Sequence, residues 1–191
     1  MNSLNYSFDH GELSSPQKQA IITLIEKKDK DKRIISNWRP ISLINVDVKI
    51  GSKAVALRLQ TVLPKIIHHN QHAYVKGRTV HDAIRTIDDI LEYTERYGIK
   101  GKMLAVDFQK AFDSVNSKFL YSTLAVFSVG PSFIQWIHTF YQNITSSVLN
   151  NGFSTGPFEI QRGVRQGDPL SPYLFIIVLE VLAIRQYTRK L

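Results

Sequence analysis

One carboxylate stands at the end of a short apolar run, in the segment Ala105-Val-Asp-Phe-Gln-Lys-Ala-Phe-Asp113. The run Met103 to Phe108 predicts a buried strand that would hold the Asp107 carboxylate on a rigid element. A buried carboxylate stays ionised only when a cation or hydrogen-bond donors compensate it. Mg²⁺ is one such cation, and nucleotidyl transfer uses it to activate a 3′-hydroxyl and to neutralise the leaving pyrophosphate. For this segment alone, an Asp107 that caps the next turn is the favoured interpretation.

A second segment, Arg162-Gly-Val-Arg-Gln-Gly-Asp-Pro-Leu-Ser-Pro172, combines glycines with ligand-binding residue types. Gly163 and Gly167 allow the backbone to approach a ligand closely. Arg165 and Gln166 supply donors for a phosphate, a sugar or a base edge. The segment then enters a helix whose N-terminus favours anions. A polar loop in front of a core helix is the alternative, and it is favoured for this segment by itself.

A third segment, Asn37-Trp-Arg-Pro-Ile-Ser-Leu-Ile44, follows the charged turn KKDKDKR. Arg39 stands between an aromatic residue and a proline of fixed backbone conformation, so its position should be well defined. Lys32 or Arg33 could swing with the predicted hairpin onto a triphosphate. The alternative is a solvated charge run, which is the usual role of such turns.

The fourth segment, Gln71-His-Ala-Tyr-Val-Lys-Gly-Arg78, is basic and contains one aromatic residue. Lys76, Arg78 and Tyr74 could contact a nucleic-acid backbone. The alternative is that Tyr74 packs against the protein.

Composition narrows the function classes. The 191 residues are 43% hydrophobic and 21% charged, as in ordinary globular domains, and the net charge is +8. This excess of positive charge makes a polyanion such as nucleic acid the first candidate partner. The absence of cysteine excludes disulfides and thiolate chemistry, and the six histidines show no zinc-binding spacing. No Ser-His-Asp order or Walker-type phosphate loop occurs. The N-terminus does not resemble a signal peptide, and no apolar run is long enough to span a membrane.

Helices and strands alternate in the expected order of elements, which predicts an α+β or α/β domain. Strands are expected at 21–25, 40–44 and 103–108, and the first two should form an antiparallel hairpin with a basic tip. A second hairpin is expected to join 145–149 to 158–161 through the turn Asn150-Asn-Gly152. Helices are expected from Ser14, where a serine precedes a proline, and at 47–67, 79–97, 114–127, 131–141 and about 168–187.

The four segments occur together and in order, and they resemble the reverse transcriptases of LINE-type, non-long-terminal-repeat retrotransposons. The matching phrases are NWRPISLINVD, QHAYVKGR, AVDFQKAFDSV and RGVRQGDPLSPYLF, and the likeness extends from about Leu13 to Ile184. It implies that Asp107 is a catalytic, metal-binding aspartate with the Phe108 carbonyl beside it, and that Phe112 is the steric gate against a 2′-hydroxyl. The resemblance implies nucleotide contacts for Lys32 or Arg33, Arg39, Phe108, Ala111, Phe112, Gln166 and Gly167, and nucleic-acid contacts for Lys76, Arg78 and Arg165.

The resemblance further implies an α+β, right-hand polymerase fold with fingers and an incomplete palm and no thumb. Fingers are expected at about 13–99 and 120–160, palm at about 100–119 and 161–186, with a loose segment at 1–12 and a tail at 187–191. The implied reaction is RNA-templated extension of a DNA primer with deoxynucleoside triphosphates and Mg²⁺, or Mn²⁺ in its place. The expected location is the nucleus or cytoplasm, without membrane association or secretion, and the oligomeric state is left open.

The family's next motif, an aromatic residue, any residue and two aspartates, is missing from the sequence. The one Asp-Asp pair, Asp88-Asp89, falls inside a predicted helix. We therefore expect the chain to be truncated before this motif and inactive by itself, with the apolar faces of 103–108 and of the last helix uncovered. A non-catalytic nucleic-acid-binding remnant or a non-functional gene fragment is the alternative. A maturase is a more distant alternative, because the residues of the motifs are closer to those of the LINE type. A viral RNA polymerase is also more distant, because a bulky Phe112 at the gate position suits deoxynucleotides.

Overall fold

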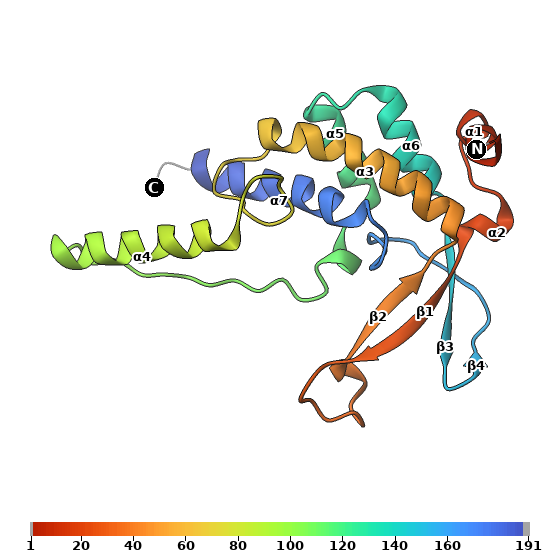
Figure 1. The fold of residues 1–191 in the computed structure, drawn as a ribbon, viewed down its shortest axis with the longest axis horizontal. Coiled ribbons are helices and arrows are strands. Elements are labelled where there is room, and N and C mark those ends of the chain that lie inside the picture. Colours follow the sequence, from red (N-terminus) through yellow and green to blue (C-terminus); the bar gives the residue numbers. More distant parts are fainter. Residues whose placement is uncertain (1, 189–191) are drawn as a thin grey trace.

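The computed structural model describes residues 2–188, with the side chains of residues 3–185. It combines a helical body with a mixed β-sheet that projects from one side of it (Figure 1). The helices are α1 (Asn2–His10), α2 (Ser15–Lys18), α3 (Val46–Ile66), α4 (Val80–Arg96), α5 (Ser117–Val126), α6 (Pro131–Tyr141) and α7 (Ser171–Thr188), with short 3₁₀ turns η1 (Ile35–Asn37) and η2 (Phe112–Ser114). The strands are β1 (Gln19–Glu26), β2 (Trp38–Leu43), β3 (Thr145–Asn150), β4 (Phe153–Ser154) and β5 (Phe158–Glu159).

The sheet has the order β2-β1-β3-β4, with β5 also paired to β3. β1 and β2 form the predicted antiparallel hairpin, in a register that runs from Ile21 opposite Leu43 to Glu26 opposite Trp38. β1 also pairs with β3 in parallel, although most of the chain separates the two strands. This long-range pairing brings the N-terminal hairpin next to the residues that lead into α7.

The core lies between α3, α5, α6 and α7. The buried positions of α3 recur at helical spacing, as the sequence predicted, and include Val48, Val55, Leu59 and Leu63. α5 and α7 pack side by side, and both contribute fully buried leucines, Leu124 and Leu174 among them. All of these residues belong to one apolar cluster, so the α3–α7 body is a continuous core.

The N-terminal residues are not loose, contrary to the prediction for residues 1–12. Residues 2–10 form α1, which packs on α6 through the stacked rings of Phe8 and Trp136, with ring centres 4.5 Å apart. The Gln135 side chain also donates to the Phe8 carbonyl at 3.0 Å. An aromatic contact across such a sequence distance is not visible in the short polar stretch that forms α1.

The segment 103–108 is extended but pairs with no strand, so the prediction of a buried strand is wrong. Its apolar side chains are exposed, with Leu104 at 85% and Met103 at 72%. A strand needs a hydrogen-bonding neighbour, and no described residue supplies one here. The exposure itself was expected, and it confirms that this apolar face is uncovered.

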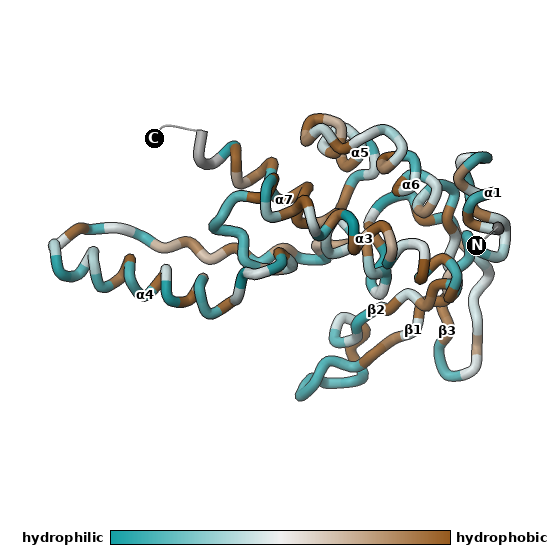
Figure 2. The backbone as a smooth tube through the Cα atoms, turned by 45° about the horizontal axis from the view of Figure 1, so that its top comes forward, coloured by the Kyte–Doolittle hydropathy of each residue, from teal (hydrophilic) through white to brown (hydrophobic). Residues whose placement is uncertain are grey.

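Helix α4 extends away from the helical body, and the segment 99–111 runs back alongside it (Figures 1 and 2). None of the residues of α4 is buried, although Ile84, Ile87, Ile90 and Leu91 form an apolar face along this helix. Thr79 begins the helix with a capping box, in which its hydroxyl accepts from the Asp82 amide and the Asp82 carboxylate accepts from the Thr79 amide. This carboxylate is stabilised by the bonds from Thr79, which lower the pKa of Asp82.

The second hairpin turns at Asn151 and Gly152, both with positive φ, as the sequence predicted. Its return strand differs, because β3 pairs first with β4 and then with β5. The predicted tail at 187–191 begins within α7, and residues 189–191 lie outside the described residues. Among residues 2–188, no helix has the length and apolar character needed to cross a membrane.

Candidate functional site

Three of the four segments singled out in the sequence meet at one cleft of about 250 Å³. The cleft is lined by Pro40 and Ser42 of β2, by Asp113 of η2 and by the loop 162–166. The loop is tied to β2 by one main-chain hydrogen bond, in which the Ser42 amide donates to the Gln166 carbonyl at 2.8 Å. Gln166 is half-buried at the cleft.

The same loop is tied to η2 by two further main-chain bonds. The Val164 amide donates to the Phe112 carbonyl at 2.8 Å, and the Gly163 amide donates to the Val115 carbonyl at 2.7 Å. Backbone bonds to both neighbours fix the loop independently of its side chains. The side chains of Gln166 and Asp113 are therefore presented from a rigid frame.

Both glycines of the loop approach the protein itself. Gly163 has φ +95, and a Cβ there would lie 2.9 Å from the Asp113 Cα; Gly167 has φ +107, and a Cβ there would lie 2.8 Å from the Ser42 carbonyl oxygen. Neither conformation suits a residue with a side chain. Both glycines are therefore required by the packing of the chain's own backbone.

Arg165 is buried, and its position differs from the predicted contact with nucleic acid. It is 5% exposed, and its Nη2 donates to the Lys18 carbonyl at 2.6 Å, which ties the loop to the start of β1. Burial lowers the pKa of Arg165, while nearby Tyr141 and Asp168 act in the opposite direction. The sequence showed the donor but not its burial, which arises from long-range packing.

A buried hydrogen-bond network holds the end of the loop. The Tyr141 hydroxyl, from α6, donates to the Asp168 carboxylate at 2.5 Å and lies 2.9 Å from the Ser171 hydroxyl. Asp168, 6% exposed, also accepts from the Leu170 amide at 3.1 Å, so it caps the turn that leads into α7. Burial, followed by the charge of Asp168, raises the pKa of Tyr141 well above its ordinary value. Sequence reasoning missed Tyr141, and no local signal marks it.

Asp107 and Arg39 do not line this cleft, although the sequence led us to expect both there with Gln166. Asp107 lies on the exposed, unpaired segment 103–108, which cannot fix the carboxylate as a strand would. No group of three or more His, Asp or Glu side chains among residues 2–188 is placed to hold a metal ion. The oxygen donors of Asp107 and Phe108 suit Mg²⁺ in kind but are too few to form its site.

Phe112 and its neighbours face the other side of η2. Phe112 stacks on Phe175 of α7 with ring centres 5.3 Å apart and packs against the core. Phe108 and Ala111 line an apolar cleft of about 470 Å³ between η2, α5 and α7. This cleft includes the uncovered apolar side of α7, where Leu182 is 43% exposed, so the expected exposure of the last helix is also observed.

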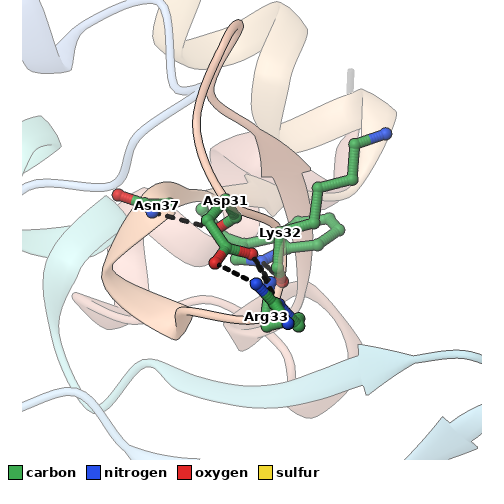
Figure 3. A network of polar contacts seen from close by, with 5 residues as sticks. Asp31, Lys32, Arg33 and Asn37 are labelled. Carbon is green, nitrogen blue, oxygen red and sulfur yellow. Dashed lines mark hydrogen bonds and ion pairs between the residues drawn. The ribbon is translucent and has the colours of Figure 1, made fainter.

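The basic tip of the β1–β2 hairpin is internally paired. Arg33 donates to both carboxylate oxygens of Asp31, at 3.1 and 3.0 Å, and Asn37 donates to the Asp31 carbonyl (Figure 3). The hydrogen bonds between them lower the pKa of Asp31 and raise that of Arg33. The Lys32 side chain points away from this pair and forms an ion pair with Glu26 at 2.6 Å.

The hairpin register identifies another basic residue near Arg39. Arg39 lies opposite Ile25, and the Lys27 amide donates to the Asn37 carbonyl at 2.9 Å, which extends the register beyond β1. Side chains alternate along a strand, so Lys27 falls on the same side as Ile25 and Arg39. No sequence pattern distinguishes Lys27 from the other lysines of the turn, because its position depends on the pairing register.

The fourth segment, 71–78, has a structural role at Arg78. The Arg78 guanidinium donates to carbonyls of the segment that follows α3, namely those of His68 at 2.6 Å, Gln71 at 2.8 Å and Ile67 at 3.0 Å. At 3.4 Å it also reaches the Pro64 carbonyl in the last turn of α3, where a helix C-terminus leaves carbonyl groups open. These bonds occupy the group that was predicted to contact nucleic acid, whereas Lys76 remains exposed.

Comparison with known proteins identifies the family. Residues 25–190 match the family described as reverse transcriptase (RNA-dependent DNA polymerase), and the chain belongs to it. The chain is 41% identical over 177 residues to the transposon TX1 uncharacterized 149 kDa protein of Xenopus laevis. The aligned region covers 93% of this chain and 14% of that protein.

Two proteins of retrotransposable elements are also similar. The Pol polyprotein from type-2 retrotransposable element R2DM of Drosophila melanogaster is 29% identical, over 76% of this chain and 14% of its own length. That of type-1 retrotransposable element R2 of Popillia japonica is 28% identical, over 90% of this chain and 24% of its own length. The resemblance to reverse transcriptases of non-LTR retrotransposons is thus confirmed, and the chain spans a small part of each relative.

Proposed function

We propose that the chain forms the nucleotide-holding part of an RNA-directed DNA polymerase, which extends a DNA primer 3′-hydroxyl on an RNA template. The observation that carries the proposal is the junction of β2, η2 and the loop 162–166 at one cleft, in a chain of the reverse transcriptase family. Main-chain bonds at 2.7–2.8 Å join the three segments, so the cleft is part of the fold and not a chance gap. The family match does not favour the alternative of a non-catalytic nucleic-acid-binding remnant or a non-functional gene fragment.

In this proposal the cleft receives the incoming deoxynucleoside triphosphate. Gln166 lies beside its sugar. Exclusion of a ribonucleotide 2′-hydroxyl by Phe112 with Ala111 would require η2 to turn these side chains from the α7 side toward the cleft. Arg39 grips the triphosphate from the hairpin, and the register favours Lys27 as its companion over Lys32 or Arg33. Arg33 and Lys32 would first have to leave Asp31 and Glu26, their ion-pair partners, whereas Lys27 would leave only the Ser36 carbonyl, to which its Nζ donates at 2.9 Å.

The proposed domain division follows the sequence interpretation. Residues of about 13–99 and 120–160 would form fingers, and about 100–119 and 161–186 would form part of the palm. Asp107 and the Phe108 carbonyl would contribute to a Mg²⁺ site together with carboxylates that residues 2–188 do not place beside them. The Asp88-Asp89 pair is not a substitute, because both residues lie in α4.

Primer extension tests the proposal. The 191-residue chain would be compared with a version extended by a relative's segment that contains the aromatic-x-Asp-Asp motif. We expect Mg²⁺-dependent DNA synthesis on an RNA template from the extended chain only. Asp107→Ala in the extended chain should reduce synthesis by at least about a hundredfold, the order of effect seen when a catalytic group is removed, while the control Asp88→Ala/Asp89→Ala should retain it. Undiminished synthesis by Asp107→Ala would refute the assignment.

A further inference from the structure

Much of the net positive charge of the chain falls in one stretch that lacks acidic residues. Residues 48–81 contain no aspartate or glutamate, and they contain six lysine or arginine residues. Most of this stretch is helix α3, which lies along the helical body (Figure 1). The next helix, α4, is instead rich in acidic residues, with Asp82, Asp88, Asp89, Glu92 and Glu95. Such a distribution indicates a localised cationic surface and not a uniformly basic protein.

Four exposed cations, here called the α3 strip, lie on the two flanks of the outer side of α3. At about 3.6 residues per turn, Lys49 and Lys53 fall on one flank and Arg58 and Lys65 on the other. They follow one another after four, five and seven residues, which corresponds to steps of about 6, 7.5 and 10.5 Å along the helix axis. Exposed aliphatic side chains lie between them: Val46, Ile50, Leu57 and Val62. The opposite side of α3 is already buried in the core, so the strip is the free side of a firmly anchored helix.

No acidic side chain of the described residues neutralises the α3 strip. Among residues 3–185, the ion pairs join Lys18 to Glu12, Lys32 to Glu26, Arg33 to Asp31 and Arg96 to Glu92. The nearest carboxylate in sequence, Asp47, accepts hydrogen bonds from the Gln17 side chain and from the Val48 amide. The strip therefore presents uncompensated positive charge along about 24 Å of helix.

We propose that the α3 strip binds the sugar–phosphate backbone of single-stranded RNA at a surface separate from the nucleotide cleft. No residue of α3 lines that cleft. A strand that crosses the outer side of α3 would pair its phosphates with the cations of both flanks, and the aliphatic side chains between the flanks would contact riboses. The choice of RNA as the polyanion rests on the proposed function, since that reaction copies an RNA.

The fold also supports a longer contact surface at the end of α3. Arg78 binds the carbonyls at the C-terminus of α3, so the turn that carries Lys76 is fixed to that end of the helix. Lys76 is exposed and has no acidic partner in the described part of the chain. A membrane surface fits less well, because the broad apolar side of α3 faces the core and the outer side keeps only a narrow row of aliphatic residues, Val46, Ile50 and Leu57, between the two flanks of cations.

RNA binding by the whole chain tests the inference. The variant Lys49→Gln/Lys53→Gln/Arg58→Gln/Lys65→Gln removes four charges from the strip. The control Arg85→Gln/Lys100→Gln/Lys102→Gln/Lys118→Gln removes four charges from exposed sites elsewhere. Fluorescence anisotropy with an RNA of about 30 nucleotides and mixed sequence, which is longer than the strip, would give Kd over a range of salt concentrations. All eight side chains are exposed, and thermal melting would verify that both variants fold.

We expect the strip variant to bind RNA at least about tenfold more weakly than the control variant. Its dependence of log K on log salt should be shallower by about 0.7 for each lost phosphate contact. Equal Kd values for the two variants would overturn the inference. It would also be overturned if the strip variant lost binding to anionic phosphatidylserine vesicles but kept its affinity for RNA.

A further pair of measurements separates this inference from the proposed function. Leu57→Ser should weaken RNA binding only slightly and leave the salt slope unchanged. A large loss of RNA binding with Leu57→Ser alone would indicate an apolar partner and contradict the inference.

Primer extension by the completed chain reports on the nucleotide cleft independently. RNA binding through the strip without any DNA synthesis would count against the proposed function and leave the strip assignment intact.

Discussion

The backbone of Gly167 lies against the carbonyl of Ser42, so closely that a Cβ at position 167 would come within 2.8 Å of that oxygen. The neighbouring Gln166 carbonyl accepts the Ser42 amide. Two consecutive residues of the loop thus seat it on the edge of β2. This contact sets where the Gln166 side chain meets the cleft, and it makes residue 167 sensitive to substitution.

Gly167→Ala should destabilise the fold by about 1–3 kcal/mol, because alanine is strained at positive φ and its methyl group would displace β2. Urea unfolding would measure the loss. Gly156→Ala is the matched control, since a Cβ at position 156 would meet no other atom within 4 Å and Gly156 has no positive φ. Equal midpoints for the two variants would show that the contact with Ser42 is not tight in solution.

Tyr141→Phe should cost about 1–3 kcal/mol of stability, because it removes one of the bonds that satisfy the buried Asp168 carboxylate. Tyr121→Phe serves as the control, as Tyr121 is half-buried but its hydroxyl has no hydrogen-bond partner in the described part of the chain. Chemical denaturation of both variants checks the difference. A loss no larger than that of Tyr121→Phe would argue against the network.

Alkaline pH should act through the same residue. The pKa of Tyr141 in the folded state is raised well above 10.0, whereas an unfolded tyrosine ionises near that value. The unfolded state therefore releases its proton first, and the stability contribution of Tyr141 is full below about pH 10 and is lost as the pH rises further. Unfolding measured between about pH 9 and 11 should show a steeper decline for the native chain than for Tyr141→Phe. Parallel curves would contradict this assignment.

Arg78→Lys should destabilise the chain by about 2–3 kcal/mol, because an ammonium cannot reproduce the planar fork that binds the carbonyls after α3. Lys76→Ala, two residues earlier, should leave the melting temperature unchanged, since Lys76 is exposed. Thermal melting of the two variants separates the structural role of Arg78 from a contact with nucleic acid. If both variants melted like the native chain, the cap would be unimportant.

Local patterns predicted most of the elements. The periodic apolar residues of α3, the Gly-Pro start of α6 and the Asn-Gly turn after β3 were each visible in the sequence, and the β1–β2 hairpin was confirmed. These features depend on interactions between neighbours in the chain, so sequence spacing is enough to find them.

Long-range contacts could not be predicted in the same way. The parallel pairing of β1 with β3 and the burial of Arg165 depend on segments far apart in the sequence. The strand expected at 103–108 failed for a related reason, since an apolar run becomes a strand only when a partner pairs with it. Likewise, the motifs identified the cleft, but they did not show that Asp107 lies outside it.

The most direct test of the nucleotide cleft is the KM for deoxynucleoside triphosphates in the extended, active chain. Gln166→Ala should raise this KM at least about tenfold, because Gln166 lines the cleft. Gln142→Ala, which changes a half-buried glutamine outside the cleft, should leave it unchanged. An unaltered KM for Gln166→Ala, with the fold intact, would contradict the assignment of this cleft as the nucleotide site.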